Sequence, residues 1–421
     1  MKLKMRYRYL IALIVLLPAA SLCSAAGKPQ QIKPASCLPK TTPWDLKALS
    51  KAPEFKWAED EGKGARSLYF TGPAYKGKPT RVFAYYATPG TLARDPDQDE
   101  KLPAVVLVHG GGGKAFDQWA KLWAKRGYAA IAMDLGGCGP GKKRLKDGGP
   151  DQGDGTKFGA IDQPNSDQWT YHAVANVILV HSLIQSLKGV DADRTALTGI
   201  SWGGYLTCIV SGLDNRFKAS VPVYGCGFLH ENSVWLGRFE KMSDKQSAKW
   251  VSLWDPSSYA GSAAMPVLFV NGGADFAYPP DSHAKTAALV KAPGKNMRFV
   301  PNLRHGHIFD RPKAIEVFIE HHLNKGVALP LVGPAAIADG KATATVKTKT
   351  KLTAAALHYT TAKLAGNNRG RKWTQASATI KDNRISADAP PKDATAWFVT
   401  VTDERKVLVS SELVFPGKGI K

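Results

Sequence analysis

The stretch Thr195–Cys208, which reads Thr-Ala-Leu-Thr-Gly-Ile-Ser-Trp-Gly-Gly-Tyr-Leu-Thr-Cys, constrains the fold of this 421-residue chain more than any other. An apolar run that favours β-structure ends at Gly199, Ser201 follows, and a helix-compatible run begins after Gly203 and Gly204. This order predicts a strand, a tight turn and a helix, with Ser201 in a strained backbone conformation at the turn. Its hydroxyl would stand above the sheet at a helix N-terminus, where backbone N–H groups attract negative charge. The simpler alternative is a glycine-rich turn of an ordinary parallel sheet.

Two later residues could activate this serine. A serine hydroxyl is a poor nucleophile near neutral pH and needs a base, usually a histidine that a carboxylate orients. Asp275 follows the apolar run 266–271, and His305 follows the run 297–300. Because a parallel sheet would bring both loops together above Ser201, we expect these three residues to form a catalytic triad.

The choice of base lies between His305 and His307, which share one short loop. Two residues apart on a turning loop, their side chains would not converge on one point, so only one can reach the serine easily. We expect it to be His305, because Gly306 lets the loop turn tightly. The 30 positions from Asp275 to His305 also leave room for one helix and one strand. His307 is expected to pack at the outer edge of the loop or to line the pocket.

A second glycine-rich loop is the candidate oxyanion site. The apolar strand 103–108 leads directly into His109 and four glycines. An oxyanion needs two preorganised donors, and we expect them to be the N–H groups of Trp202 and Gly111. The same loop could also be a simple tight turn. We interpret Asp134, at the end of another strand, as a structural or pocket residue.

The rest of the first 330 residues alternates strands and helices, which predicts a mostly parallel sheet with helices on both faces. Residues 65–70 and 80–88 suggest an antiparallel hairpin at one sheet edge. The apolar patterns predict further strands at 128–133, 219–224, 266–271 and 297–300, and helices near 116–123, 169–187, 279–290 and 312–323, of which 169–187 is expected to be amphipathic.

Two long excursions interrupt this alternation, at 135–165 and 225–264, and we expect them to cover the catalytic edge of the sheet. The tryptophans of the second excursion fit a lid core better than a ligand platform. The candidate pocket residues are His109, Gly110, Tyr205, His307 and Trp235.

Residues 335–421 show alternating strand patterns separated by turn signals, which predicts a small C-terminal β-sandwich that supplies no catalytic group. The expected strands are 342–347, 354–361, 373–380, 396–401 and 406–415. Basic residues of this part could contact an acidic polymer, although a merely solvated face is the simpler interpretation: Lys347, Lys349, Lys351, Arg369, Arg371 and Lys372.

The N-terminus predicts export. A basic start, a short apolar run and small residues near Ala26 form the pattern of a cleaved signal peptide covering residues 1–26. The apolar run is short for a membrane span, and an uncleaved anchor is the alternative. We therefore divide the chain into this signal, an irregular lead-in at 27–64, a catalytic domain at 65–330 and the sandwich at 335–421.

The chain carries a formal net charge of +22, a surface that favours polyanions. No nucleic-acid motif accompanies the charge, and export argues against such a partner. Export also permits disulfides, and a bridge between Cys138 and Cys226 is conceivable because each follows a strand on the catalytic side. No cysteine spacing indicates a metal site, and we expect no cofactor.

These motifs resemble those of the α/β-hydrolase superfamily over roughly residues 65–325. The resemblance rests on four motifs: His109-Gly-Gly-Gly, Gly199-Ile-Ser-Trp-Gly-Gly, Gly273-Ala-Asp and His305-Gly. The order Ser, Asp, His along the chain is that of the superfamily. The run 254–259 and the Gly-x-Asp-x-x-x-Pro-Pro motif look like the branch of acetylxylan-esterase-like enzymes and prolyl-oligopeptidase-like peptidases.

The resemblance implies a Ser-Asp-His hydrolase of esters or amides. Two departures weaken the peptidase version: too few residues precede the sheet for the usual propeller, and residues 109–116 lack the common oxyanion-loop tyrosine. Our first hypothesis is a secreted serine esterase acting on an acylated carbohydrate or similar ester, and the second is a peptidase. The third is a silent scaffold that presents a binding sandwich, against which the intact motifs argue.

Overall fold

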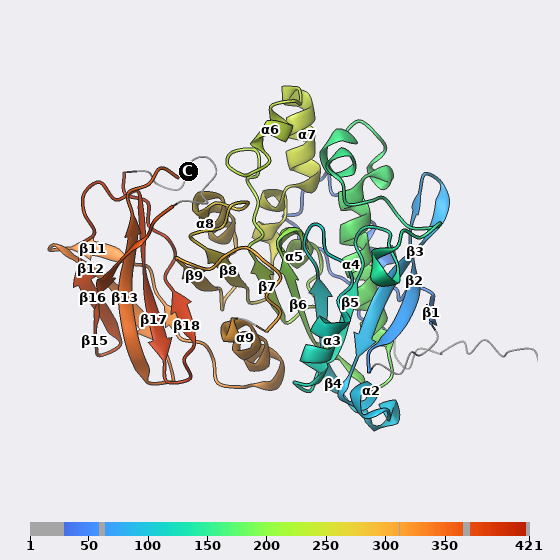
Figure 1. Cartoon of the computed structure of the whole chain (residues 1–421), viewed down its shortest axis with the longest axis horizontal. Helices are drawn as coiled ribbons and strands as arrows, with labels where there is room; N and C mark the ends of the chain where they lie inside the picture. Colours follow the sequence, from blue (N-terminus) through green and yellow to red (C-terminus); the bar gives the residue numbers. More distant parts are fainter. Residues whose placement is uncertain (1–28, 59–63, 311, 365–370, 418–421) are drawn as a thin grey trace, which may run out of the picture.

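The computed structural model describes residues 29–58, 64–310, 312–364 and 371–417. The lead-in and the catalytic part together contain nine strands in the described residues: β1 (Phe55–Trp57), β2 (Arg66–Tyr75), β3 (Lys78–Ala87), β4 (Leu102–Val108), β5 (Ala129–Met133), β6 (Val190–Ile200), β7 (Ala219–Val223), β8 (Leu268–Gly272) and β9 (Asn296–Val300). They lie side by side in the order β1-β2-β3-β5-β4-β6-β7-β8-β9 (Figure 1). The strands from β5 to β9 pair in parallel, and the β2–β3 hairpin joins them antiparallel at one edge, as the sequence predicts.

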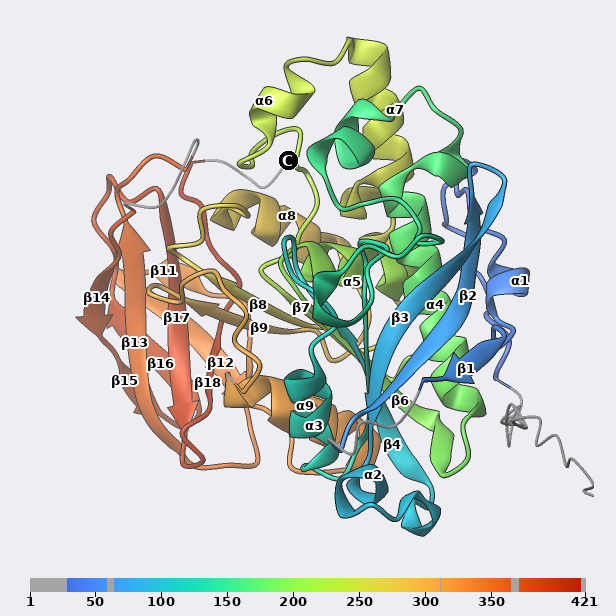
Figure 2. The same ribbon diagram turned by 45° about the vertical axis from the view of Figure 1, so that its right-hand side comes forward.

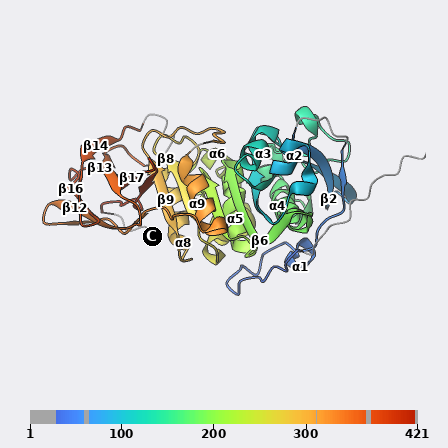
Figure 3. The same cartoon turned by 90° about the horizontal axis from the view of Figure 1, so that it is seen from below.

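Helices cover both faces of this sheet (Figure 3). They are α1 (Leu46–Leu49), α2 (Pro89–Ala93), α3 (Asp117–Ala124), α4 (Trp169–Ser186), α5 (Trp202–Leu213), α6 (Leu236–Phe239), α7 (Asp244–Trp254), α8 (Pro280–Leu289) and α9 (Lys313–Asn324). Helices α3 and α9 pack together on one face and α4 and α5 on the other. The central strands are therefore buried on both sides, which explains their continuous apolar sequences.

The two excursions lie at the carboxyl edge of the parallel strands, where Figures 1 and 2 show α6 and α7 above the sheet. The first, 135–165, is a loop with short helical turns, and the second carries α6, α7 and two further turns. Both therefore lie on the side of the sheet where the sequence places Ser201, Asp275 and His305.

Helix α4 corrects one expectation. The sequence suggests an amphipathic helix, yet Tyr171 is its only residue that is not buried. The lead-in segment packs on the face that would otherwise meet water. The Trp44 indole donates a hydrogen bond to the Tyr171 carbonyl (3.0 Å), and the Ser182 hydroxyl donates one to the Leu49 carbonyl (2.7 Å). The lead-in is thus a packed part of the catalytic core, because it supplies the second wall of α4.

The C-terminal part is a sandwich of two sheets. Its strands are β10 (Leu331–Val332), β11 (Ala336–Ala338), β12 (Lys341–Lys347), β13 (Leu352–Thr360), β14 (Thr374–Ser377), β15 (Thr379–Lys381), β16 (Arg384–Asp388), β17 (Ala396–Asp403) and β18 (Leu408–Ser410). One sheet has the order β10-β12-β16-β15 with β11 beside β12, and the other runs β14-β13-β17-β18. The strand expected at 373–380 is two strands, because the chain changes sheet between β14 and β15.

The sandwich continues the catalytic sheet. Strand β18 pairs antiparallel with β9 through Ser410 and Met297, and the Phe299 N–H donates to the Ser410 hydroxyl (2.9 Å). Phe299 also packs against Phe398, with ring centroids 5.0 Å apart. A single 13-stranded sheet therefore runs through both parts (Figure 1). The domain boundaries at 330 and 335 stay a prediction.

The N-terminal expectation of a signal peptide falls outside the described residues. The signal peptide at 1–26 lies in the part that the structure does not describe. Among the described residues, no helix is long and apolar enough to cross a membrane.

Candidate active site

Ser201 occupies a sharp turn between β6 and α5, with φ 60° and ψ −121°. A non-glycine residue in this region is strained. Two glycines make the turn possible: a Cβ at Gly203 would lie 2.0 Å from the Val108 carbonyl oxygen, and one at Gly199 would lie 2.2 Å from the Gly203 carbonyl oxygen. The glycines of the motif are therefore steric requirements of this fold, and they hold Ser201 at the carboxyl edge of the sheet.

The structure brings Ser201, His305 and Asp275 into one hydrogen-bonded chain. His305 Nδ1 lies 2.7 Å from Asp275 Oδ2, and His305 Nε2 lies 2.8 Å from Ser201 Oγ. The carboxylate can only accept, so Nδ1 carries the proton and Nε2 is free to accept from the serine hydroxyl. This is the tautomer that a general base requires.

Asp275 is itself held in place. It is fully buried, and its Oδ1 accepts hydrogen bonds from the backbone N–H groups of Ala277 (2.7 Å) and Tyr278 (2.9 Å). These donors compensate the carboxylate for the water that it has lost and fix its orientation toward His305.

His305 is held in position by two aromatic residues, Tyr224 and Phe276, which the sequence motifs do not indicate. Tyr224 donates a hydrogen bond from its hydroxyl to the Arg304 carbonyl (2.7 Å), and its ring lies 4.7 Å from the His305 ring. Phe276 packs at 5.0 Å from His305. The available signal for Tyr224 was its place directly after a strand at the catalytic edge.

The glycine loop passes directly over the nucleophile, because a Cβ on Gly110 would lie 2.8 Å from the Ser201 Cβ. The Gly110 carbonyl accepts from His109 Nδ1 (2.7 Å) and from the Gly113 N–H (3.1 Å). In a trans peptide the next N–H points the opposite way. The Gly111 N–H is therefore turned away from His109, and Gly111 lines the cavity beside Ser201.

His109 has a role different from the one expected of it. It is buried, and its Nε2 accepts the Leu135 N–H (3.1 Å), while Nδ1 donates to Gly110. Burial lowers the pKa of His109 to about 4, which keeps the ring neutral in this tautomer. The side chain faces the loop backbone instead of the pocket.

A cavity of about 280 Å³ opens over the serine, with walls that are mainly apolar or aromatic: Gly111, Ile200, Ser201, Trp202, Trp235, Phe276, Ala277, His305, Gly306 and His307. Trp235 and His307 thus lie where the sequence analysis expects them. Tyr205 does not, because it is fully buried and its hydroxyl donates to the Trp254 carbonyl under the lid.

Lys157, from the first excursion, packs against Trp202, which lines the cavity. Its ammonium lies 4.5 Å from the Trp202 ring centroid and 3.8 Å from Asp154. Burial lowers the pKa of Lys157 to about 8, so the group remains largely cationic at neutral pH. Its cation–π contact braces the residue whose N–H is the expected oxyanion donor.

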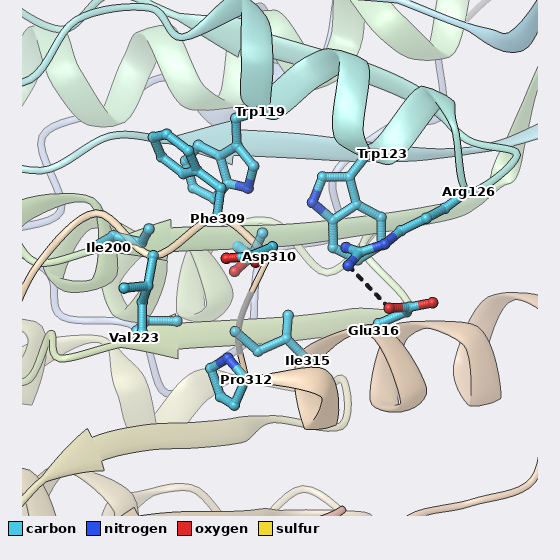
Figure 4. Close-up of a pocket in the computed structure, with 12 residues that line it drawn as sticks. Trp119, Trp123, Arg126, Ile200, Val223, Phe309, Asp310, Pro312, Ile315 and Glu316 are labelled. Atoms are coloured by element: carbon cyan, nitrogen blue, oxygen red, sulfur yellow. Dashed lines mark ion pairs between the residues drawn. The ribbon is translucent and has the colours of Figure 1, made fainter. Parts of the chain in front are cut away.

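A second cavity lies between α3 and α9, where Figure 4 shows Trp119, Phe309 and Ile315 facing one another. Its volume is about 10 Å³, and the Arg126–Glu316 ion pair (3.0 Å) borders it. That space holds one water molecule at most, so it is no substrate site.

The conceivable Cys138–Cys226 bridge is not formed. The four cysteines among the described residues are all free. Cys226 is fully buried, and burial raises the pKa of its thiol well above the usual range. Asp134 has the structural role considered for it, since its Oδ2 accepts the N–H groups of Gly136 (2.8 Å) and Cys138 (2.7 Å).

Comparison with known proteins gives two matching family models. The acetyl xylan esterase model matches residues 45–244, and the model of the PhoPQ-activated pathogenicity-related protein matches residues 234–370. The second match extends across the boundary expected at 330–335.

Among curated relatives, the uncharacterized peptidase YuxL of Bacillus subtilis is 26% identical over 250 residues, which are 52% of this chain and 35% of that protein. The dipeptidyl-peptidase 5 of Arthroderma otae is 28% identical over 154 residues, 34% of this chain and 18% of that protein.

Solved structures show a similar fold over about two thirds of the chain. The acetyl xylan esterase from Paenibacillus sp. R4 superposes with a TM-score of 0.54 at 22% identity, covering 66% of this chain and 92% of that one. The acetyl xylan esterase 1 from Thermoanaerobacterium sp. superposes with a TM-score of 0.52 at 19% identity, covering 69% of this chain and 95% of that one. At this identity the superposition shows the fold alone, and the fold is the one expected from the sequence motifs.

Proposed function

The chain belongs to the α/β-hydrolase superfamily, and from this premise we propose that it is a secreted serine esterase that cleaves short acyl esters of a carbohydrate. The hydrogen-bonded chain from Asp275 through His305 to Ser201, open to an aromatic-walled cavity, is the observation that carries the proposal. His305 takes the serine proton as Ser201 attacks the ester carbonyl, and Asp275 stabilises the resulting imidazolium.

The subsequent steps use the same residues. The tetrahedral oxyanion is stabilised by the N–H groups of Trp202 and Gly111, whose peptides the turn and the glycine loop hold in fixed orientations. His305 then returns its proton to the leaving alcohol, which leaves an acyl group on Ser201. A water molecule, activated by the same histidine, releases the acid and restores the serine.

An ester is favoured over a peptide by the size and walls of the cavity. About 280 Å³ is small for a ligand site, and it suits a short acyl group with part of a sugar ring. Trp235 and Phe276 offer flat apolar faces to such a ring. The relatives named as peptidases support the alternative, but this chain spans 35% or less of the two described above.

A substrate panel tests the ester against the peptide. We expect acetyl esters to be hydrolysed faster than longer acyl esters, and peptidyl substrates to be cleaved slowly, because the small cavity accommodates a short acyl chain best. Initial rates on p-nitrophenyl acetate, butyrate and octanoate, acetylated xylan and prolyl p-nitroanilides measure this order, with Ser201→Ala as the blank. Efficient anilide cleavage with negligible esterase activity would reverse it in favour of a peptidase.

Acidic polymer binding is a second, separate proposal about the sandwich. Lys347, Lys349 and Lys351 are exposed along the end of β12 and the turn that follows, whereas Arg371 is buried and cannot contribute. We expect the full chain to be retained on an acidic polysaccharide column and to elute with salt, since exposed charges are screened. Retention should weaken when the three lysines become glutamines. If the variant is retained as strongly as the unmodified chain, or if the unmodified chain is not retained, these lysines do not bind the polymer and the basic face is only solvated.

A further inference from the structure

His307 contacts the glycine loop at the Gly110 nitrogen, whereas His109 contacts it at the Gly110 carbonyl. The His307 Nε2 lies 3.2 Å from the Gly110 nitrogen and accepts that N–H. The ring is flanked by Phe116, with centroids 5.2 Å apart, and by Phe309 at 6.0 Å. His307 therefore packs as one wall of the cavity and is bonded to the loop that crosses the nucleophile.

The hydrogen bond defines the protonation state of this ring. Nε2 can accept an N–H only when it carries no proton, so the single proton lies on Nδ1. Burial, and then the neighbouring His305, hold the pKa of His307 below its usual value. The hydrogen bond thus requires the neutral ring, and burial favours that form.

Two imidazoles together fix both peptide planes at Gly110. His307 binds the N–H that precedes the Gly110 Cα, and His109 binds the carbonyl that follows it. Glycine has the widest choice of backbone conformations, and this loop has four in succession. Without such anchors the 110–111 peptide could rotate and turn its N–H away from the oxyanion.

We propose that His307 is a positioning residue that anchors the Gly110 N–H and so keeps the Gly111 N–H aimed at the oxyanion. The proposal rests on the esterase function above, because it concerns the transition state of that reaction. His307 makes no contact with the reacting proton, which His305 handles. Its contribution is preorganisation, the property on which the strength of an oxyanion site depends.

A pH dependence follows from the same contact. Protonation of His307 places a hydrogen on Nε2, which can no longer accept the Gly110 N–H and now faces another donor. The titratable groups that act on this site are His305 on the same loop, His109 across Gly110, and Lys142, which donates to the Gly112 carbonyl (2.8 Å) and acts on His109. Acid should therefore release the Gly110 N–H, and kcat at low pH should fall further in the unmodified chain than in a variant whose residue 307 takes up no proton.

Three variants at position 307 form the test. His307→Gln keeps an acceptor near the position of Nε2, His307→Asn carries the same amide on a shorter stem, and His307→Ala has none. We expect kcat on p-nitrophenyl acetate to fall about 10- to 100-fold in the Ala and Asn variants and to stay within about threefold in Gln, with KM little changed throughout. At low pH, kcat of the Gln variant should fall less than kcat of the unmodified chain, because a glutamine side chain takes up no proton there.

Hydrogen exchange gives a readout that is independent of activity. The segment 109–113 should exchange faster in the Ala and Asn variants than in the unmodified chain and in Gln, with unchanged melting temperatures. Equal kcat and equal exchange in all four proteins would overturn the positioning role while leaving the esterase intact. If the unmodified chain lacks Ser201-dependent turnover, the proposed function fails first, and unchanged exchange would then show that the anchor is absent as well.

Discussion

Ser201→Ala should reduce ester hydrolysis by about 10⁴- to 10⁶-fold, because the variant keeps the oxyanion site but has no nucleophile. The side chain is small and sits in a turn that depends on the adjacent glycines, so the fold should survive. The same variant should lose covalent labelling by a fluorophosphonate probe, which reacts only with a base-activated serine.

Labelling and turnover are compared with a matched control. Ser377→Ala removes a hydroxyl from an exposed position on β14 and should leave both unchanged. Circular dichroism and melting temperature show whether each variant is folded. A folded, unmodified chain that no fluorophosphonate labels would argue for a silent scaffold instead of an enzyme.

His305→Ala should lower kcat by several orders of magnitude, about as much as loss of the nucleophile, because members of a triad act as a unit. The 2.8 Å contact with Ser201 lets His305 accept the serine proton, and the 2.7 Å contact with Asp275 orients its ring. His307→Ala, by contrast, should keep a measurable fraction of the activity, since the base remains in place.

The ratio of the two effects is the decisive measurement. Single-turnover and steady-state rates for both alanine variants should differ by at least about 100-fold, with His305 the more severe. Asp275→Asn gives a third value, expected near a 10⁴-fold loss because the amide favours the wrong imidazole tautomer. Turnover that survives in His305→Ala and disappears in His307→Ala would exchange the assignments of the two histidines.

The sequence predicts the catalytic sheet well because its signals are local. Each buried strand is a short apolar run, and the turn at Ser201 needs small neighbours at fixed offsets, so both can be recognised without knowing the partners. The order of Ser201, Asp275 and His305 then suffices to predict which loops meet. The distances between their side chains could not be predicted from the sequence, because a sequence pattern places loops at one edge of the sheet but does not orient side chains.

Several of the misplaced expectations depend on contacts that no local sequence pattern reveals. Nothing within 169–187 indicates that Trp44 covers the outer face of α4. His109 adjoins the glycine loop and Tyr205 lies one helical turn after Ser201, yet His109 turns back to its own backbone and Tyr205 faces Trp254. Strand β16 is different, because it is absent from the expected strands although Asp382 and Asn383, both at positive φ, mark a tight hairpin directly before it.

The pairing of β9 with β18 has a consequence for how the chain avoids self-association. If the chain ended after the catalytic part, β9 would be an edge strand with free N–H and carbonyl groups and with Phe299 uncovered, which is a template for pairing with other molecules. The separated sandwich would expose β18 in the same way. Each part therefore protects the other's vulnerable edge, and the boundary between them is a poor place to cut the chain.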